Sequence, residues 1–286
     1  MACVLLENEY LRIEVEEDGA ELQSIYAKKM GKELLWHGET AIWPDRAPWL
    51  FPVVGQLKND HFEWKKQSYR LPLHGFAKEK KFHHIKDDKR QIVFELREDE
   101  STLEHYPWPF VLQIAYRLKG ETLCVDCEIQ NPGHEDMYFS FGAHTGFCCS
   151  PGDRLTFTAD RKLLCYRLDE KNHLLITEGK LIPSVITLER SLFENDAMLI
   201  CAPLSQAVTL HRQEGYGIEM SFGKVPWVGI WSKTGFDVPY ICIEPWAGVD
   251  DPLNADGRIE HKLDIQKLRP GEKFEMRLAI RPFAAK

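Results

Sequence analysis

The chain has 286 residues, and its 36 basic and 44 acidic side chains give a formal net charge of −8. Hydrophobic residues make up 44% of it and charged residues 28%, as in a globular protein with a sizeable core. A mildly acidic chain without a basic cluster is not a typical nucleic-acid-binding protein. We find neither an apolar run of roughly 20 residues, as a membrane span requires, nor a secretory signal, and we expect a cytoplasmic protein with no membrane partner.

Hydrophobic and polar residues alternate along much of the chain, as they do in strands with one buried face. The alternating runs are, in chain order, residues 11–15, 92–96, 110–118, 137–141, 155–157, 218–222 and 274–280. Glycine and proline turns separate the runs, for example at 131–133. We therefore expect an all-β fold, a large antiparallel β-sandwich that forms a single domain over residues 1–286. Short helices are predicted only near 101–105 and 192–196.

The eight cysteines are too few for a disulfide scaffold in a chain of this length. Cys124 and Cys127 form a C-x-x-C pair, a spacing that can indicate a zinc or redox site. However, the pair lies in an alternating run, and residues three apart on a strand point to opposite faces. We therefore expect no metal site at these cysteines.

Two loops that interrupt the alternation carry candidate binding residues. Arg46 is the one arginine of the apolar segment 45–55, which is rich in proline and aromatic residues. An arginine buried there requires a partner, either a carboxylate of the protein or the hydroxyls of a ligand. His74 precedes Gly75, where the backbone can approach a neighbour closely. This pattern is short, and by itself it favours a structural loop histidine.

A later strand contains small residues beside a histidine. If the odd-numbered residues from 139 to 143 face the core, Ser140, Gly142 and His144 share the opposite face. Small side chains at two of these positions predict a hollow beside the imidazole, which is typical of a pocket floor. His144 is therefore a candidate functional residue.

Glu244 ends an apolar strand and precedes Pro245 and Trp246. A carboxylate in such surroundings is poorly hydrated, which raises its pKa toward the range of a general base. The preceding apolar run, 227–231, places Trp231 on one face beside a glycine, an arrangement that suits a sugar ring, although a single tryptophan is more often core. The chain lacks a nucleotide-binding glycine loop and a serine nucleophile elbow, which leaves cofactor-free acid–base chemistry on a polar small molecule.

Taken together, these segments resemble the aldose 1-epimerase (mutarotase) family, and most closely its LacX-like branch. The motifs that carry the resemblance span nearly the whole chain and lie at 17–25, 34–38, 46–52, 73–78, 139–144, 244–248 and 268–272. Each motif is short, but their order and content are specific together. The resemblance implies the galactose mutarotase-like supersandwich, whose concave face holds the sugar.

The resemblance also implies roles for individual residues. Glu244 corresponds to the general base of the family and His144 to its general acid. His74 corresponds to a second histidine, which contacts the sugar near the ring oxygen. Arg46 and Asp196 fall where relatives place residues that contact the substrate. The family's reaction needs no metal and no nucleotide.

The chain departs from the family pattern at two places. Thr145 follows the acid histidine, where relatives usually have proline. Residues 249–251 read Val-Asp-Asp, where an aliphatic-Ala-Asp sequence is expected. Neither change removes a catalytic group, but we expect the rim of the site to differ.

The implied activity is the interconversion of the α and β anomers of a free aldose through ring opening and closure. Glu244 would take the proton of the C1 hydroxyl while His144 protonates the ring oxygen. Such a pair predicts a bell-shaped pH profile, with the acid limb from the carboxylate and the alkaline limb from the imidazole. The expected partner is a small sugar.

Three other functions remain open at this stage. A non-catalytic sugar-binding or sensing protein would share the fold but would not need a matched acid and base. A glycoside hydrolase usually needs two carboxylates about 5–9.5 Å apart, and Asp196 is the only second candidate. A hexose-phosphate 1-epimerase would need a cluster of basic residues, whereas neither Arg46 nor Lys78 lies in a clear basic group.

Overall fold

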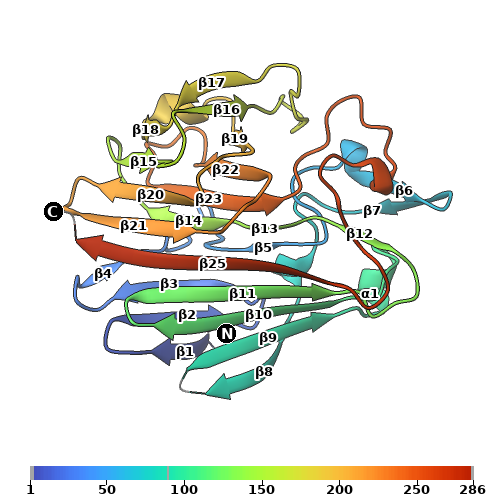
Figure 1. Cartoon of the computed structure of the whole chain (residues 1–286), viewed down its shortest axis with the longest axis horizontal. Helices are drawn as coiled ribbons and strands as arrows, with labels where there is room; N and C mark the ends of the chain where they lie inside the picture. The colour runs from blue at the N-terminus through green and yellow to red at the C-terminus, as the bar shows by residue number, and fades with distance from the viewer. Residues whose placement is uncertain (1–2, 89, 285–286) are drawn as a thin grey trace.

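In the computed structural model, which describes residues 3–88 and 90–284, two large antiparallel sheets dominate the molecule (Figure 1). The first sheet has nine strands. Their order is β18 (Val185–Thr187), β15 (Arg154–Thr156), β20 (Ala207–Arg212), β21 (Tyr216–Ser221), β25 (Lys273–Ala284), β11 (Thr122–Gln130), β10 (Val111–Lys119), β9 (Gln91–Arg97) and β8 (His83–Asp88).

The second sheet has eight strands and carries the residues discussed below. Its order is β17 (Lys180–Pro183), β16 (Lys162–Tyr166), β19 (Met198–Cys201), β22 (Trp227–Trp231), β23 (Tyr240–Ala247), β13 (Phe141–Ala143) and β5 (Trp49–Leu50), and β14 (Thr145–Cys148) also pairs with β23. Because β13 and β14 both pair with β23, the chain between them runs alongside one continuous strand.

Three smaller sheets and a few short helical turns complete the described residues. The sheets are β1 (Cys3–Glu7), β2 (Leu11–Glu16), β3 (Leu22–Ala27) and β4 (Lys32–Glu33); β6 (His61–Trp64) and β7 (Gln67–Arg70); and β12 (Met137–Phe139) and β24 (Gln266–Leu268). The helices are α1 (Glu100–Leu103), η1 (Lys58–Asp60), η2 (Ala77–Glu79), η3 (Arg190–Phe193) and η4 (Ile259–His261). No helix in the described part of the chain has the length and apolar character needed to cross a membrane.

The predicted all-β antiparallel sandwich is confirmed. The alternation seen in the sequence is the alternation of burial, as β11 shows: every second residue from Leu123 to Ile129 is buried and its neighbours are partly exposed. Cys124 and Cys127 thus lie on opposite faces of this strand, as their spacing requires. One core cluster contains residues from both large sheets and from β2 and β3.

The structure differs from the sequence-based elements in two places. The single run predicted at 137–141 is two strands in different sheets, β12 and β13, and the chain changes sheets at Ser140. The backbone N–H of Ser140 donates to Pro52, and its hydroxyl accepts from Val54, so polar contacts replace the sheet ladder there. The helix predicted near 192–196 is a 3₁₀ turn, η3, that ends at Phe193, before Asp196.

Candidate active site

Glu244 and His144 are brought together by strand register. β23 pairs with β13 through Gly142 and Trp246 and with β14 through Thr145 and Ile243. The same register sets His144, the residue just before Thr145, opposite Glu244. Residues opposite each other on antiparallel strands project their side chains from the same face. The backbone N–H of His144 donates to Pro48, on the side away from β23.

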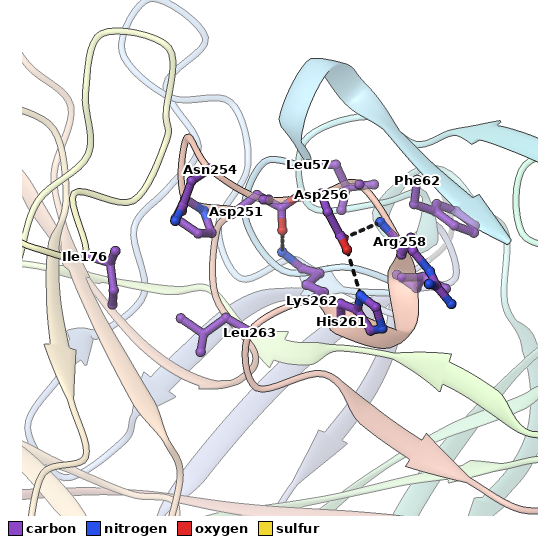
Figure 2. Close-up of a pocket in the computed structure, with 14 residues that line it drawn as sticks. Leu57, Phe62, Ile176, Asp251, Asn254, Asp256, Arg258, His261, Lys262 and Leu263 are labelled. Atoms are coloured by element: carbon purple, nitrogen blue, oxygen red, sulfur yellow. Dashed lines mark hydrogen bonds and ion pairs between the residues drawn. The ribbon is translucent and has the colours of Figure 1, made fainter.

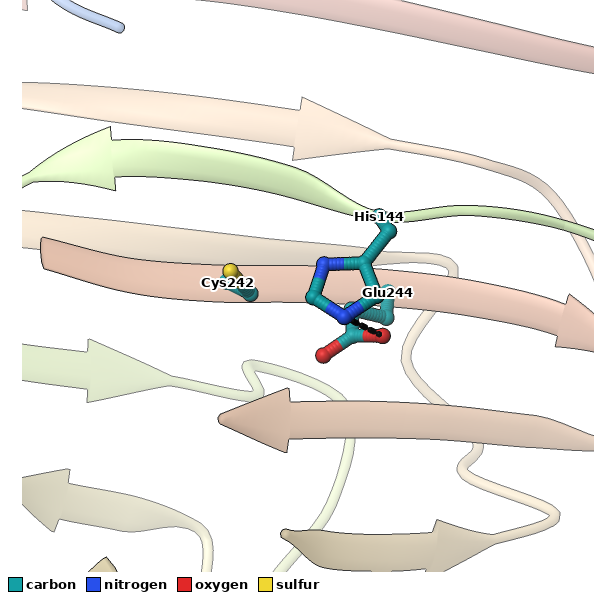
Figure 3. A group of neighbouring side chains, drawn as sticks. All are labelled: His144, Cys242 and Glu244. Carbon is teal, nitrogen blue, oxygen red and sulfur yellow. Dashed lines mark ion pairs between the residues drawn. The ribbon is translucent and has the colours of Figure 1, made fainter. Parts of the chain in front are cut away.

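The imidazole and the carboxylate form a close, buried contact (Figure 3). His144 Nε2 lies 3.1 Å from Glu244 Oε2, and the two side chains are 10% and 2% exposed. The contact lacks hydrogen-bond geometry: within the described residues, neither Glu244 Oε2 nor His144 Nδ1 has a hydrogen-bond partner. Buried polar atoms in folded proteins are nearly always paired, so these two atoms mark a site that can receive polar groups of a ligand.

Burial works against charge on both members of this pair. It raises the pKa of Glu244 well above the ordinary value of 4.5, and the carboxyls of Asp196 and Asp250 raise it further. It lowers the pKa of His144 well below 6.5, and the nearby His74 and Lys78 add to that effect. Burial therefore favours the uncharged form of each side chain, a protonated carboxyl group and a neutral imidazole.

The pair opens into a cavity of about 320 Å³, near the lower end of the range of roughly 300–1,000 Å³ for small-molecule sites. Its polar lining residues are Asp45, His74, Lys78, His144, Asn172, Asp196, Lys233, Glu244 and Asp250. Its aromatic lining residues are Trp43, Trp231 and Trp246. The rings of Trp43 and Trp231 lie 5.0 and 5.5 Å from the imidazole of His144, between centroids, so the acid–base pair is flanked by flat apolar surfaces.

His74 is held in a defined orientation at the cavity wall. Its backbone is left-handed, with φ of 64°, and Gly75 after it has φ of 72° and no room for a side chain against Phe51. His74 Nδ1 accepts a hydrogen bond from the Gly55 N–H at 3.0 Å, which leaves Nε2 to carry the proton of the neutral ring. Burial and the charge of Lys78 lower the pKa of His74 to about 3, so the ring is neutral at physiological pH.

Of the six site residues predicted from the sequence, five line this cavity: Glu244, His144, His74, Asp196 and Trp231. Arg46 lies elsewhere. Its guanidinium donates through Nη1 to the backbone carbonyl of Gln23, and the side chain packs against Gly38. The partner that a half-buried arginine requires is thus supplied by the protein backbone, and the expected substrate contact of Arg46 does not follow from its position.

The small residues beside His144 do not leave the hollow that the sequence predicted. A Cβ on Gly142 would lie 2.5 Å from the indole of Trp246, and a Cβ on Gly229, across β22, would lie 3.1 Å from the same indole. The glycines therefore make room for Trp246. Trp246 also lines the cavity, and among the described residues its buried indole Nε1 has no hydrogen-bond partner.

Three residues of the cavity wall, Trp43, Trp246 and Asp250, were not predicted from the sequence. Trp43 lies outside the alternating strands, and the sequence shows Trp246 only as a neighbour of Glu244. The departure at 249–251 was the one sequence signal that pointed to Asp250. That residue lies in the cavity wall, although it was expected only to alter the rim.

Cys242 lies close enough to the pair to raise the question of a metal. The nearest ligand atoms of His144, Cys242 and Glu244 all lie within 4.8 Å of one another (Figure 3). Cys242 is fully buried in a cluster with Trp36 and Tyr240 and does not belong to the cavity lining. Burial raises the pKa of its thiol well above 9.0, which opposes the thiolate that zinc binds. This donor set does not fit a metal site.

A second cavity lies in the loop between Pro252 and Leu263 (Figure 2). Its charged groups are already paired: Lys262 with Asp251 at 2.7 Å, and His261 with Asp256 at 2.7 Å. Because these charged groups already pair with one another, a ligand would have to break the existing contacts in order to bind them. The cavity with unpartnered buried atoms is the stronger candidate for function.

Matches to known proteins cover nearly the whole chain. The family model described as aldose 1-epimerase matches residues 2–281. The plasmid form of Protein LacX from Lactococcus lactis subsp. lactis is 28% identical over 284 residues, which cover 93% of this chain and 94% of that protein.

Solved structures agree with the fold. The structure of a galactose mutarotase related enzyme from Lactobacillus acidophilus has a TM-score of 0.95 and 29% identity, and the match covers 100% of this chain and 98% of that one. A galactose 1-epimerase from Lactobacillus acidophilus NCFM has a TM-score of 0.76 over 99% of this chain and 95% of that one, at 13% identity. The second likeness concerns the fold alone.

Proposed function

Since the chain belongs to the aldose 1-epimerase family, we propose that it is a cofactor-independent mutarotase that interconverts the α and β anomers of a free aldose. The observation that carries the proposal is the contact of 3.1 Å between His144 Nε2 and Glu244 Oε2 at the wall of a sugar-sized cavity. A hemiacetal has two oxygens on one carbon, and ring opening moves a proton at each of them. An adjacent acid and base fit that requirement.

In the forward direction, Glu244 accepts the proton of the C1 hydroxyl and His144 donates a proton to the ring oxygen. The bond between C1 and the ring oxygen breaks, and an open-chain aldehyde with a C5 hydroxyl forms. Rotation about C1–C2 presents the other face of the carbonyl. On closure His144 takes back the proton of the C5 hydroxyl and Glu244 returns its proton to the carbonyl oxygen, so the enzyme ends as it began.

The number of protons that Glu244 and His144 share is compatible with this cycle. The reactive state, an ionised Glu244 with a protonated His144, contains one proton, and so does the neutral state that burial favours. The two states differ only in which of the two side chains carries that proton, and His144 Nε2 lies 3.1 Å from Glu244 Oε2. Polar groups of a bound sugar stabilise the charged arrangement by contacting the unpartnered atoms.

The other lining residues are assigned to sugar binding. His74, with its Nδ1 engaged by Gly55, offers Nε2–H as a donor to a sugar oxygen. Trp231 and Trp43 supply apolar faces beside the reacting end of the ring. Asp196, half-buried with a backbone φ of 57°, offers a carboxylate to a hydroxyl.

The charge of the cavity favours a neutral sugar over the alternative substrate, a hexose phosphate. Its lining includes four carboxyl groups against two lysines, and Lys78 is already paired with Asp45 at 3.1 Å. Phosphate sites instead gather arginine and lysine. A purely sugar-binding protein is the second alternative, and it gives no reason for a buried acid–base pair whose atoms lack other partners.

Proton NMR of freshly dissolved α-glucose and α-galactose tests the proposal. We expect added protein to accelerate the growth of the β-anomer signal, with glucose 6-phosphate accelerated less than glucose. Binding without acceleration would support the sugar-binding alternative. Release of a monosaccharide from a disaccharide would support a hydrolase, for which Asp196 would be the second carboxylate.

A further inference from the structure

Asp250 follows β23 in the chain and lines the same cavity as Glu244. The residue is only 2% exposed. Its Oδ1 accepts a hydrogen bond of 2.7 Å from the backbone N–H of Gln56. Its Oδ2 is buried and has no hydrogen-bond partner within the described residues. A buried carboxylate oxygen without a donor is costly, so the atom is placed for a donor that arrives from the cavity.

The backbone at residues 55–56 fixes this carboxyl group. Gly55 has φ of 71°, and a Cβ there would lie only 2.4 Å from Asp250 Oδ1, so no larger residue fits against the carboxylate. The N–H of Gly55 also donates to His74 Nδ1. Neighbouring backbone amides, of Gly55 and Gln56, therefore hold His74 and Asp250, which sets the spacing of an imidazole and a carboxyl group in the cavity wall.

The next residue shows that an aspartate in this segment can be fully satisfied. Asp251 Oδ1 accepts from Lys262 Nζ at 2.7 Å, and its Oδ2 accepts from the backbone N–H of Lys58 at 3.0 Å. Both oxygens of Asp251 therefore have partners, whereas one oxygen of Asp250 has none among the described residues. Of these two neighbours, only Asp250 lines the cavity that also contains Glu244. The unpartnered oxygen therefore belongs to the residue that a ligand in this cavity would meet.

We propose that Asp250 is a specificity-determining residue that accepts, through Oδ2, a hydrogen bond from one hydroxyl group of the sugar. The assignment rests on the proposed mutarotase function and goes beyond the residues assigned to the sugar above. It predicts that the substrate has a free hydroxyl group at the carbon that lies nearest to Asp250 Oδ2. A sugar that lacks the hydroxyl leaves a buried carboxyl group unpartnered, and such sites discriminate strongly against deoxy analogues.

The test combines a variant with a set of deoxy sugars. Asp250→Asn keeps the size of the side chain and the acceptor for the Gln56 amide, but it puts an amide into the cavity. Binding is measured by the fluorescence of the cavity tryptophans, and turnover by NMR, for glucose, galactose and their 2-, 3-, 4- and 6-deoxy forms. Asp256→Asn, a change of the same charge at an exposed residue of the following loop, is the matched control.

We expect Asp250→Asn to weaken binding and kcat/KM for the parent sugar roughly 10- to 100-fold, the range for a hydrogen bond to a charged group. One deoxy sugar should lose the same factor with the wild-type protein and lose nothing further with the variant, which identifies the hydroxyl. The control Asp256→Asn should match the wild type. Asp250→Ser, which also removes the buried carboxyl, should show the same pattern and serves if the asparagine variant does not fold.

Equal losses for every sugar, including all deoxy forms, would make Asp250 a structural residue and overturn the proposal. Unchanged binding in both variants would overturn it as well. Because binding is followed separately from turnover, the two proposals can fail separately. A wild-type protein that binds sugars without accelerating anomerisation would refute the mutarotase, while the deoxy series still decides the role of Asp250. A wild-type protein that binds none of these sugars would refute both.

Discussion

Two buried acid–base pairs, whose carboxylates Glu244 and Asp251 are close in the sequence, have opposite character. In the pair of Asp251 and Lys262, the ammonium group contacts the carboxylate at 2.7 Å and also donates to the carbonyl of Val249, and the second carboxylate oxygen has a backbone donor. In the pair of Glu244 and His144, the atoms are 3.1 Å apart, and within the described residues one atom of each side chain has no hydrogen-bond partner.

The difference separates a structural pair from a functional one. A buried ion pair contributes to a fold only when its remaining hydrogen-bond capacity is satisfied, as it is for Lys262. The unsatisfied pair lowers the stability of the empty protein and keeps its polar atoms available to a ligand. Removing a member of each pair should therefore have opposite effects on activity and on stability.

The largest effect is expected for Glu244→Gln. The amide keeps the shape of the side chain but cannot accept the C1 proton, so the rate of anomer interconversion should fall by about 10²–10⁴-fold. Stability should be unchanged or higher. The folded protein keeps the Glu244 proton above pH 4.5 while the unfolded chain releases it, so wild-type stability falls relative to the variant as the pH rises through that range. Polarimetry and thermal unfolding measure the two quantities.

The result would contradict the assignment of Glu244 if the variant retained wild-type turnover. Equal loss of activity and of stability would place Glu244 with the structural pair instead. His144→Asn provides the companion measurement: a fall in kcat indicates the acid, whereas a rise in KM alone indicates a binding residue.

Lys262→Met is expected to produce the reverse pattern. The substitution leaves the buried carboxylate of Asp251 without its counter-charge, which should lower the free energy of unfolding by about 3–5 kcal/mol. Urea unfolding measures that loss. A second substitution, Asp251→Asn, in the same chain should recover part of it, because no unpaired charge then remains. At temperatures where the single variant is folded, its kcat should be close to that of the wild type.

The protonation order within the catalytic pair should be unusual. Burial raises the pKa of Glu244 and lowers that of His144, so the acid limb of the pH profile belongs to protonation of the imidazole, below pH 6.5, and the alkaline limb to ionisation of Glu244, above pH 4.5. This order reverses the one expected from the sequence. Carbon-13 NMR of labelled glutamate and nitrogen-15 NMR of labelled histidine follow each group directly. A Glu244 signal that titrates near or below 4.5 would contradict the order.

The sequence predicted the fold more fully than the site, and the reason is physical. Period-two alternation along β9, β10 and β25 reports which face of each strand is buried, and this is a local property. The contact between Glu244 and His144 depends on register between strands about 100 residues apart, and no local pattern contains it. Motif resemblance supplied the two residues, but only the register shows that they are opposite each other.

Two contacts that the sequence alone does not contain depend on long-range packing. The need of Arg46 for a partner was predicted, and its Nη1 donates to the carbonyl of Gln23, while its contact with a substrate stays a prediction. Gly142 was expected to leave a hollow, and the indole of Trp246 fills it. In each case the contacting group comes from a distant segment of the chain.

The smallest effect is expected for Cys242→Ala, which tests whether the buried thiol belongs to either class of pair. Cys242 contacts the aromatic cluster of Trp36 and Tyr240, outside the cavity lining, so its loss should lower stability modestly, by about 1 kcal/mol, through a small packing defect. Turnover should be unchanged, and a chelator such as EDTA should leave wild-type activity intact.

If the variant or the chelator abolished turnover, the three nearby ligand atoms of His144, Cys242 and Glu244 would have to be reinterpreted as a metal centre. The acid–base mechanism would then fail at the contact on which it depends, because a metal-bound Nε2 cannot deliver a proton to the ring oxygen.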